Sequence, residues 1–210
     1  MKNLLKLFIL CLISCNTNQI NSSSPTLNDS TSAHDQIQAN DIYYSVTPLQ
    51  QPKGNDCWIT SLTMLKRWKQ NNPNLTIQEV LNVLGDPYSI YFQTNSGLPG
   101  TDLLAFYQKA GVAYDQPQNY TIDGWISLLK SHGPAIVDVL SFIDPIKRIV
   151  WTHARVIVGI EKKATDLESK IILIDPAVGT EVSQTFKEFL EKYEAEPANQ
   201  LDHIQVAYLK

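Results

Sequence analysis

The sequence has little cysteine, glycine or histidine, and its basic residues do not outnumber its acidic ones. Among 210 residues there are 3 Cys, 9 Gly and 4 His, with 17 Lys+Arg against 21 Asp+Glu and a net charge of −4. So few Cys and His exclude a metal-rich protein, and so little Gly excludes a fibrous one. The mild acidity argues against a sequence-independent nucleic-acid binder. A hydrophobic content of 43% excludes a wholly disordered chain, so we expect one globular domain with appendages at most.

The N-terminus lacks an apolar run long enough to cross a bilayer. The run over 7–13 follows Lys2 and Lys6, and a membrane-spanning helix needs roughly 20 apolar residues. This pattern is typical of a secretory signal. The segment Leu12-Ile13-Ser14-Cys15 is similar to the lipobox of bacterial lipoproteins, in which the cysteine is lipidated and becomes the new N-terminus. An ordinary cleaved signal is the alternative, but the charges, the apolar run and the small residue in register favour lipidation of Cys15.

These features divide the chain into three parts. Residues 1–14 are the predicted signal, and residues 15–40 are the lipidated Cys15 with a polar tether that buries too little apolar surface to fold. The folded domain is predicted over 41–210. Because Cys11 leaves with the signal and Cys15 carries lipid, Cys57 is the only free thiol of the mature protein. It has no partner for the disulfide that is usual in secreted proteins.

Within the predicted domain, helical patterns come first and strand patterns follow. Apolar spacing, N-cap residues and stop glycines predict helices over 57–68, 77–84, 103–110 and 122–131, the second of them opened by a capping-box pattern at Thr76 and Glu79. Runs rich in Val and Ile predict strands over 135–140, 154–160, 171–174 and 204–209, with an amphipathic helix over 186–193. This order indicates an α+β fold in which a helical lobe is followed by an antiparallel sheet lobe, with a cleft between the two.

Cys57 stands at the start of the first predicted helix, after the N-cap types Asn55 and Asp56. The exposed N–H groups and the macrodipole at a helix start stabilise a thiolate and lower its pKa. The alternative for a lone cysteine is a small buried hydrophobe. The helix start and the missing disulfide partner favour a nucleophile.

A thiolate nucleophile needs an imidazole that forms an ion pair with it and protonates the leaving group. Of the 4 histidines, His34 lies in the tether, His132 precedes a Gly-Pro turn and His203 opens the last strand as a packed or edge residue. His153 starts the strand 154–160 and can project into the cleft. A histidine at a strand start is, by itself, more often structural.

Two further residues complete the predicted site. Asp175 ends the strand 171–174 and can reach the histidine that starts an adjacent antiparallel strand, because those two ends lie side by side. Its alternative role is a turn-initiating Asp-Pro. Gln51 precedes Cys57 by six residues and can donate a side-chain N–H to an oxyanion, with Gln50 as the neighbouring alternative.

The motif Gln51-Pro-Lys-Gly-Asn-Asp-Cys57-Trp58 resembles the active-site segment of papain-like cysteine proteases, in which a glutamine lies six residues before a Cys-Trp pair. Two later segments are similar, more narrowly, to the bacterial avirulence-effector branch: His153-Ala-Arg-Val-Ile-Val-Gly-Ile160 and Ile174-Asp-Pro-Ala-Val-Gly179. Bacteriocin-processing peptidases share the same residue order. The resemblance covers roughly residues 46–195.

The resemblance implies a papain-like fold with Cys57 as nucleophile, His153 as base and acid, Asp175 as the orienting residue and Gln51 as oxyanion donor. The family usually has small residues, often Ala-Ala, after Cys-Trp, whereas this chain has Ile59-Thr60. We expect this difference to narrow the cleft wall and to affect substrate preference more than catalysis. No phosphate loop, haem signature or zinc spacing is present, so neither a cofactor nor a metal is expected.

The leading prediction is a lipid-anchored, monomeric cysteine peptidase of the bacterial cell envelope that acts on a peptide or protein and binds no nucleic acid. One alternative is a cell-wall peptide amidase or acyltransferase that uses the same triad, since fold alone does not decide chemistry. The other is a catalytically retired lipoprotein that binds peptides or proteins. The presence of all four catalytic residue types favours catalysis.

Overall fold

The computed structural model describes residues 41–115, 120–144, 149–195 and 204–210, which belong to one compact unit. The predicted signal over 1–14, the tether over 15–40 and the lipidation residue Cys15 lie outside these residues. No helix in the described part of the chain is long and apolar enough to span a membrane.

The described residues form an α+β structure, as the sequence predicts. The helices are α1 (Cys57–Gln70), α2 (Ile77–Leu84), α3 (Tyr88–Thr94), α4 (Leu103–Ala110), α5 (Ile122–His132) and α6 (Phe186–Tyr193). The strands are β1 (Ile42–Tyr43), β2 (Val112–Asp115), β3 (Ala135–Asp144), β4 (Ile149–Glu161), β5 (Lys170–Asp175), β6 (Thr180–Thr185) and β7 (Val206–Leu209). Short 3-10 segments lie at Gly100–Asp102 and Asp166–Glu168.

The helix bounds agree with prediction where local signals are strong. Helices α2, α4 and α6 have the predicted bounds, whereas α1 and α5 run one or two residues further. At α2 the Thr76 hydroxyl accepts from the N–H of Glu79 at 3.2 Å, and the Glu79 carboxylate accepts from the N–H of Thr76 at 2.7 Å. The predicted capping box is therefore confirmed. Sequence patterns miss α3, β1, β2 and β6.

The strands form one antiparallel sheet in the order β2-β7-β3-β4-β5-β6, and β1 adds to β4 at Gly159 and Ile160. Strand β4 pairs with β3 over most of its length, but β5 joins it only from Val156 onward. The edge of β4 that precedes Val156 is thus free of β5. The start of α1 packs at this open edge, where the Ser61 hydroxyl donates to the Ala154 carbonyl oxygen.

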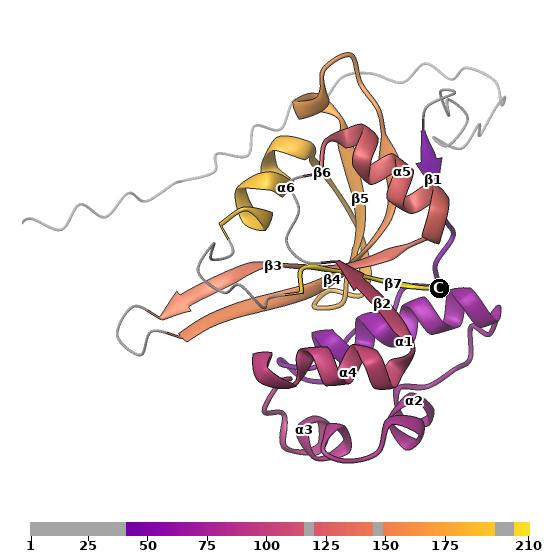
Figure 1. The fold of residues 1–210 in the computed structure, drawn as a ribbon, viewed down its shortest axis with the longest axis vertical. Helices are drawn as coiled ribbons and strands as arrows, with labels where there is room; N and C mark the ends of the chain where they lie inside the picture. Colours follow the sequence, from indigo (N-terminus) through magenta and orange to yellow (C-terminus); the bar gives the residue numbers. More distant parts are fainter. Residues whose placement is uncertain (1–40, 116–119, 145–148, 196–203) are drawn as a thin grey trace, which may run out of the picture. The chain divides into compact units, whose positions relative to one another are not determined.

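Alternate strand residues face opposite ways, so each face of the sheet has its own helices (Figure 1). Ile136 and Val156 pack with α1–α4 on one face, and Val137 and Ile157 pack with α5 and α6 on the other. The sheet is therefore covered on both faces. Helix α5 differs from the expected helical lobe, because it joins α6 on the face away from α1.

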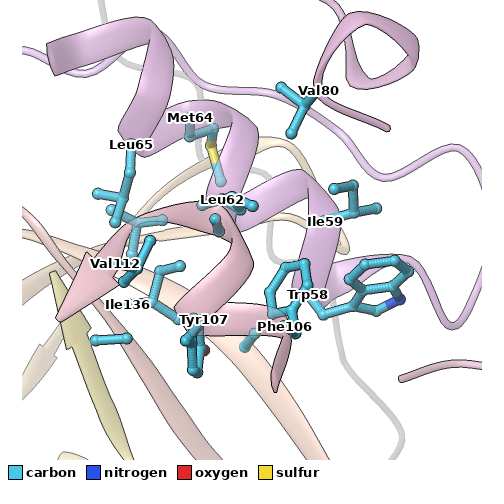
Figure 2. Close-up of a cluster of buried hydrophobic side chains, with 14 of the residues drawn as sticks. Trp58, Ile59, Leu62, Met64, Leu65, Val80, Phe106, Tyr107, Val112 and Ile136 are labelled. Atoms are coloured by element: carbon cyan, nitrogen blue, oxygen red, sulfur yellow. The ribbon is translucent and has the colours of Figure 1, made fainter. Parts of the chain in front are cut away.

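Helix α1 lies deep in the core. All eight residues from Trp58 to Leu65 are buried, so this half of α1 is enclosed on every side rather than along one apolar stripe. Trp58 meets Phe106 of α4 edge-on, with ring centroids 5.1 Å apart. Figure 2 shows this cluster, in which side chains of α1 meet those of α4 and of the sheet residue Ile136. The nucleophile candidate thus sits at the end of an immobilised helix.

Candidate active site

Cys57 is the first residue of α1 and is partly buried. Its thiol interacts with the backbone N–H of Ala154 at the open edge of β4. One turn along α1, the Ser61 hydroxyl donates to the carbonyl oxygen of the same residue at 3.1 Å. The start of α1 is thereby held against the residue that follows His153.

The electrostatics of the thiol differ from the prediction. Burial raises the pKa of Cys57 to about 11, the N–H of Ala154 acts in the opposite direction, and the nearby charge of the buried Asp138 on β3 raises it again. The N–H groups of Trp58 and of Cys57 itself lower the pKa, as expected at a helix start, but they do not outweigh burial. In the resting protein the thiol is therefore neutral unless a neighbouring base takes its proton.

Asp56 holds the N-cap position of α1, yet its side chain makes no capping hydrogen bond, which corrects the prediction of a capping side chain. The carboxyl is fully buried, and neither oxygen is in hydrogen-bonding geometry with any described residue. Burial raises its pKa by more than the charge and the N–H of Lys53 lower it. The first-turn N–H groups of α1 consequently face the thiol instead of a cap.

Gln51 lies in the loop before α1, and its side chain turns back into that loop. Its Nε2 donates to the carbonyl oxygens of Lys53 at 2.9 Å and Gly54 at 2.8 Å. Its Oε1 is buried and has no partner among the described residues. In the resting structure the amide is thus engaged with the loop.

The loop is anchored to the end of α3. The N–H of Asn55 donates to Oδ1 of Asn95 at 3.0 Å, and Nδ2 of Asn55 donates to the Asn95 carbonyl at 2.8 Å. The Lys53 ammonium donates to the carbonyls of Phe92 and Gln93, each at 3.0 Å. Asn95 adopts the left-handed conformation, with φ 54°, which asparagine tolerates better than most residues. These contacts fix the backbone immediately before Cys57.

His153 and Asp175 are in direct contact. Nε2 of the imidazole lies 2.7 Å from Oδ1 of Asp175, and the two side chains are only 15% and 13% exposed. The contact arises because β4 and β5 run antiparallel and Asp175 follows Ile174, which pairs with Val156. With Nε2 engaged by the carboxylate, Nδ1 is the ring nitrogen left for chemistry.

Asp175 is surrounded by donors and positive charge. Burial alone raises its pKa, but the hydrogen bond from His153, the N–H of Ala177, and the charges of His153 and Arg155 together bring it to about 2. The N–H of Ala177 donates to Oδ1 at 2.9 Å. Nε of Arg155 lies 3.1 Å from Oδ2, an ion-pair distance without the alignment of a hydrogen bond.

The turn after Asp175 packs on the glutamine segment. The N–H of Gln51 donates to the Pro176 carbonyl at 2.8 Å, and Nε2 of Gln50 donates to the Ala177 carbonyl at 3.4 Å. Gly179 has φ +69°, and a Cβ at this position would lie 2.6 Å from Cβ of Gln50. Only glycine fits such a turn. The segment that carries Asp175 therefore also holds the backbone of Gln51.

Other residues weighed from sequence lie apart from this group. His132 ends α5 and stacks on Tyr208, with ring centroids 4.0 Å apart. His34 and His203 are outside the described residues. Ile59 and Thr60 are fully buried in α1, so they form core rather than the cleft wall that we expected them to narrow.

Sequence patterns miss Arg155 and Asp138. The available signal for Arg155 is its position two residues after His153, which places both side chains on one face of a strand. Asp138 pairs with Ala154 across β3 and β4, a register that no local pattern gives. In the part of the chain that the structure describes, no group of three or more His, Cys, Asp or Glu could hold a metal ion.

The arrangement places a thiol at a helix start beside a strand that carries an imidazole–carboxylate pair, which are the components of nucleophilic acyl transfer. A family model described as papain-like cysteine protease AvrRpt2 matches residues 36–194. This range includes all four predicted site residues. A search of curated proteins finds no match. Because the family model covers well over half of the chain, the protein belongs to this family of papain-like cysteine proteases, the bacterial effector-type branch that its motifs resemble, and is a cysteine peptidase.

Proposed function

We propose that the protein hydrolyses peptide bonds with Cys57 as nucleophile, His153 as base and acid, and Asp175 as the orienting residue. The observation that carries this proposal is the contact of 2.7 Å between Nε2 of His153 and Oδ1 of Asp175. It fixes the tautomer and the ring orientation, because a carboxylate on Nε2 leaves Nδ1 for the thiol. The residue next to His153 already contacts that thiol.

The raised pKa of Cys57 is compatible with this role. A buried thiol with a pKa of about 11 is inert alone at neutral pH. Transfer of its proton to Nδ1 of His153 gives a thiolate–imidazolium pair, in which Asp175 stabilises the positive charge. The thiolate attacks the scissile carbonyl, the imidazolium protonates the departing amine, and water then hydrolyses the thioester.

The oxyanion donors in this proposal are the backbone N–H of Cys57 and Nε2 of Gln51. Because both loop carbonyls now accept from Nε2, one N–H of the amide turns from the loop to the oxyanion when substrate binds. The Asn55–Asn95 and Gln51–Pro176 hydrogen bonds keep the backbone in place during this change.

The test is alkylation of Cys57 by iodoacetamide across the pH range, followed by intact mass, together with hydrolysis of fluorescent casein. The wild type should be labelled at about pH 5–6, because an imidazole-paired thiol stays reactive there. In His153→Ala, labelling should begin only as the pH approaches the pKa of the unassisted thiol, about 11. Both His153→Ala and Cys57→Ala should lose hydrolysis.

His132→Ala is the matched control, since His132 stacks on Tyr208 away from the site. It should keep both labelling and hydrolysis. Equal labelling of wild type and His153→Ala would contradict the ion pair, and casein hydrolysis by Cys57→Ala would contradict the nucleophile. Release of peptides from peptidoglycan without casein hydrolysis would instead favour an amidase.

We further propose that the enzyme is tethered to the bacterial cell envelope through lipid on Cys15. The support is the lysine-flanked apolar run that ends in Ser14-Cys15. In a detergent phase-partition assay the wild type and Cys11→Ala should enter the detergent phase, and Cys15→Ala should remain in the aqueous phase. Aqueous partition of the wild type would overturn this proposal.

A further inference from the structure

Arg155 shares the carboxylate of Asp175 with His153. Residues 153 and 155 alternate with Ala154 along β4, so both side chains lie on one face of the strand. His153 approaches Oδ1 at 2.7 Å, and Nε of Arg155 lies 3.1 Å from Oδ2. The imidazole and the guanidinium therefore take different oxygens of one carboxylate.

This contact is not a surface ion pair. The side chains of Arg155 and Asp175 are 14% and 13% exposed. In so little solvent, charges a few ångströms apart interact much more strongly than they do in water. The contact also lacks hydrogen-bond alignment, so the guanidinium acts on the carboxylate chiefly through its charge and its packing.

We propose that Arg155 is a positioning residue of the site: it holds the Asp175 carboxylate in the rotamer that presents Oδ1 to His153, and its charge keeps the thiol–imidazole pair in its working protonation range. This inference rests on the proposed function. Without Arg155 the carboxylate loses its partner on Oδ2, and the contacts that still position it are those of Oδ1 with His153 and with the N–H of Ala177. Without the positive charge, every titrating group nearby holds its proton to higher pH.

A purely structural role makes a different prediction. A buried ion pair whose partner is removed lowers the stability of the fold, but it leaves the pH dependence of the chemistry in place. The groups that set this dependence are Cys57 on α1, His153 on β4 and Asp175 on β5, with Asp138 of β3 acting on the thiol. All of them remain in an Arg155 variant, so a changed pH profile reports the charge of Arg155.

The experiment compares wild type, Arg155→Met and Arg155→Lys by iodoacetamide labelling and casein hydrolysis across pH. In Arg155→Met the hydrolysis rate should fall about tenfold or more, as a positioning contact is lost. In plots of rate against pH, the rise on the acid side of the labelling curve and both the acid and the basic limbs of the hydrolysis curve should move to higher pH by roughly one unit. Arg155→Lys should keep the limbs where they are, because it keeps the charge, while recovering only part of the rate.

Arg67→Met is the matched control. It removes another half-buried guanidinium, whose Nε donates to the Leu75 carbonyl at 2.7 Å. Arg67 lies ten residues along α1 from Cys57, which is about 15 Å at the rise of a helix. This variant should lose stability without moving either limb. Arg155→Gln serves as a second neutral variant if Arg155→Met does not fold.

Two failures are distinguishable. If neutral Arg155 variants keep the wild-type limbs while His153→Ala still abolishes labelling at acid pH, the role of Arg155 is overturned and the proposed function stands. If His153→Ala leaves the labelling profile unchanged, no ion pair exists and both proposals fall. Movement of the limbs in Arg155→Lys as large as in Arg155→Met would also overturn the charge-based role.

Discussion

The thiol of Cys57 and the carboxyl of Asp175 are both largely withdrawn from water, yet their pKa values move in opposite directions. Burial raises the pKa of the Cys57 thiol from 9.0 to about 11. For the carboxyl, the same desolvation is outweighed, and the pKa falls from 3.8 to about 2. The carboxyl has an imidazole, a guanidinium and a backbone N–H around it. In the described part of the chain, the groups that lower the pKa of the thiol are backbone N–H groups, and the charge of Asp138 opposes them.

This difference shows where the site holds its permanent charge. Asp175 is ionised at any working pH because its partners favour the charged form. Cys57 is not, so its reactivity depends on a proton acceptor rather than on the helix start. In the proposed mechanism, His153 therefore lies between Asp175, which is always charged, and Cys57, which becomes charged only when its proton moves to the imidazole.

The largest expected effect on this comparison comes from replacing Asp175 with Asn and unfolding both proteins in acid. The pKa of Asp175 is lower in the folded protein, so its stabilisation is complete above pH 3.8 and is lost as the pH falls from 3.8 to about 2. The loss corresponds to about 2 kcal/mol. In urea titrations across this window, the free energy of unfolding should fall more steeply for wild type than for Asp175→Asn.

Asp123→Asn provides the control for this measurement. Asp123 forms an ion pair with Lys162, but its side chain is 71% exposed, and such pairs contribute little. This variant should follow the wild-type acid dependence. Parallel acid curves for wild type and Asp175→Asn would contradict the asymmetry between the two groups.

Elements with local signals could be predicted from sequence, and those made by distant contacts could not. Helix α2 carries its own capping box, so its bounds follow from Thr76 and Glu79. Helix α3 begins after Pro87 without a side-chain cap. It is held by contacts such as the hydrogen bond from Tyr91 to Asp102. Strand β6 is mostly polar and half-exposed, so only its pairing with β5 identifies it.

The site shows the same limit. The adjacency of His153 and Asp175 follows from two strand ends and an antiparallel rule, both of which are readable locally. The pKa of Cys57 depends on burial of α1 and on Asp138, which lies 81 residues away in the chain. The rule that a helix start lowers the pKa of a thiol takes account of neither the burial nor the charge of Asp138. Arg155 lies beside Asp175 because Val156 pairs with Ile174 across β4 and β5, a register that no local pattern gives.

A smaller effect is expected from a variant that disturbs the loop before α1 and leaves the thiolate–imidazolium pair intact. In Asn95→Gly the left-handed backbone is kept, but the Oδ1 acceptor for Asn55 is lost. We expect casein hydrolysis to fall about tenfold, because the oxyanion donors are less well fixed. Iodoacetamide labelling of Cys57 should be unchanged, since that reaction forms no oxyanion.

Asn71→Gly is the matched control, because Asn71 ends α1 in the same left-handed conformation, with φ 49°. It should leave both reactions unchanged. A loss of labelling in Asn95→Gly that equals its loss of hydrolysis would show that the loop supports the thiolate itself, and the two sides of the site would no longer be separable.

The smallest expected effects concern the starts of α1 and α2. The N-cap side chain of α2 makes a capping hydrogen bond, and that of α1 does not. Thr76→Ala removes the cap of α2 and should lower the free energy of unfolding by ~1 kcal/mol. Asp56→Ser should raise it by a similar amount, ~1 kcal/mol, because a carboxyl whose burial outweighs the stabilising effect of Lys53 is replaced by a hydroxyl that can cap α1. Urea unfolding at neutral pH measures both. Destabilisation by Asp56→Ser would mean that the carboxyl supports the loop before Cys57. Stabilisation would mean that the start of α1 lacks a stabilising cap of the kind that Thr76 provides to α2, so that its N–H groups remain available to the thiol.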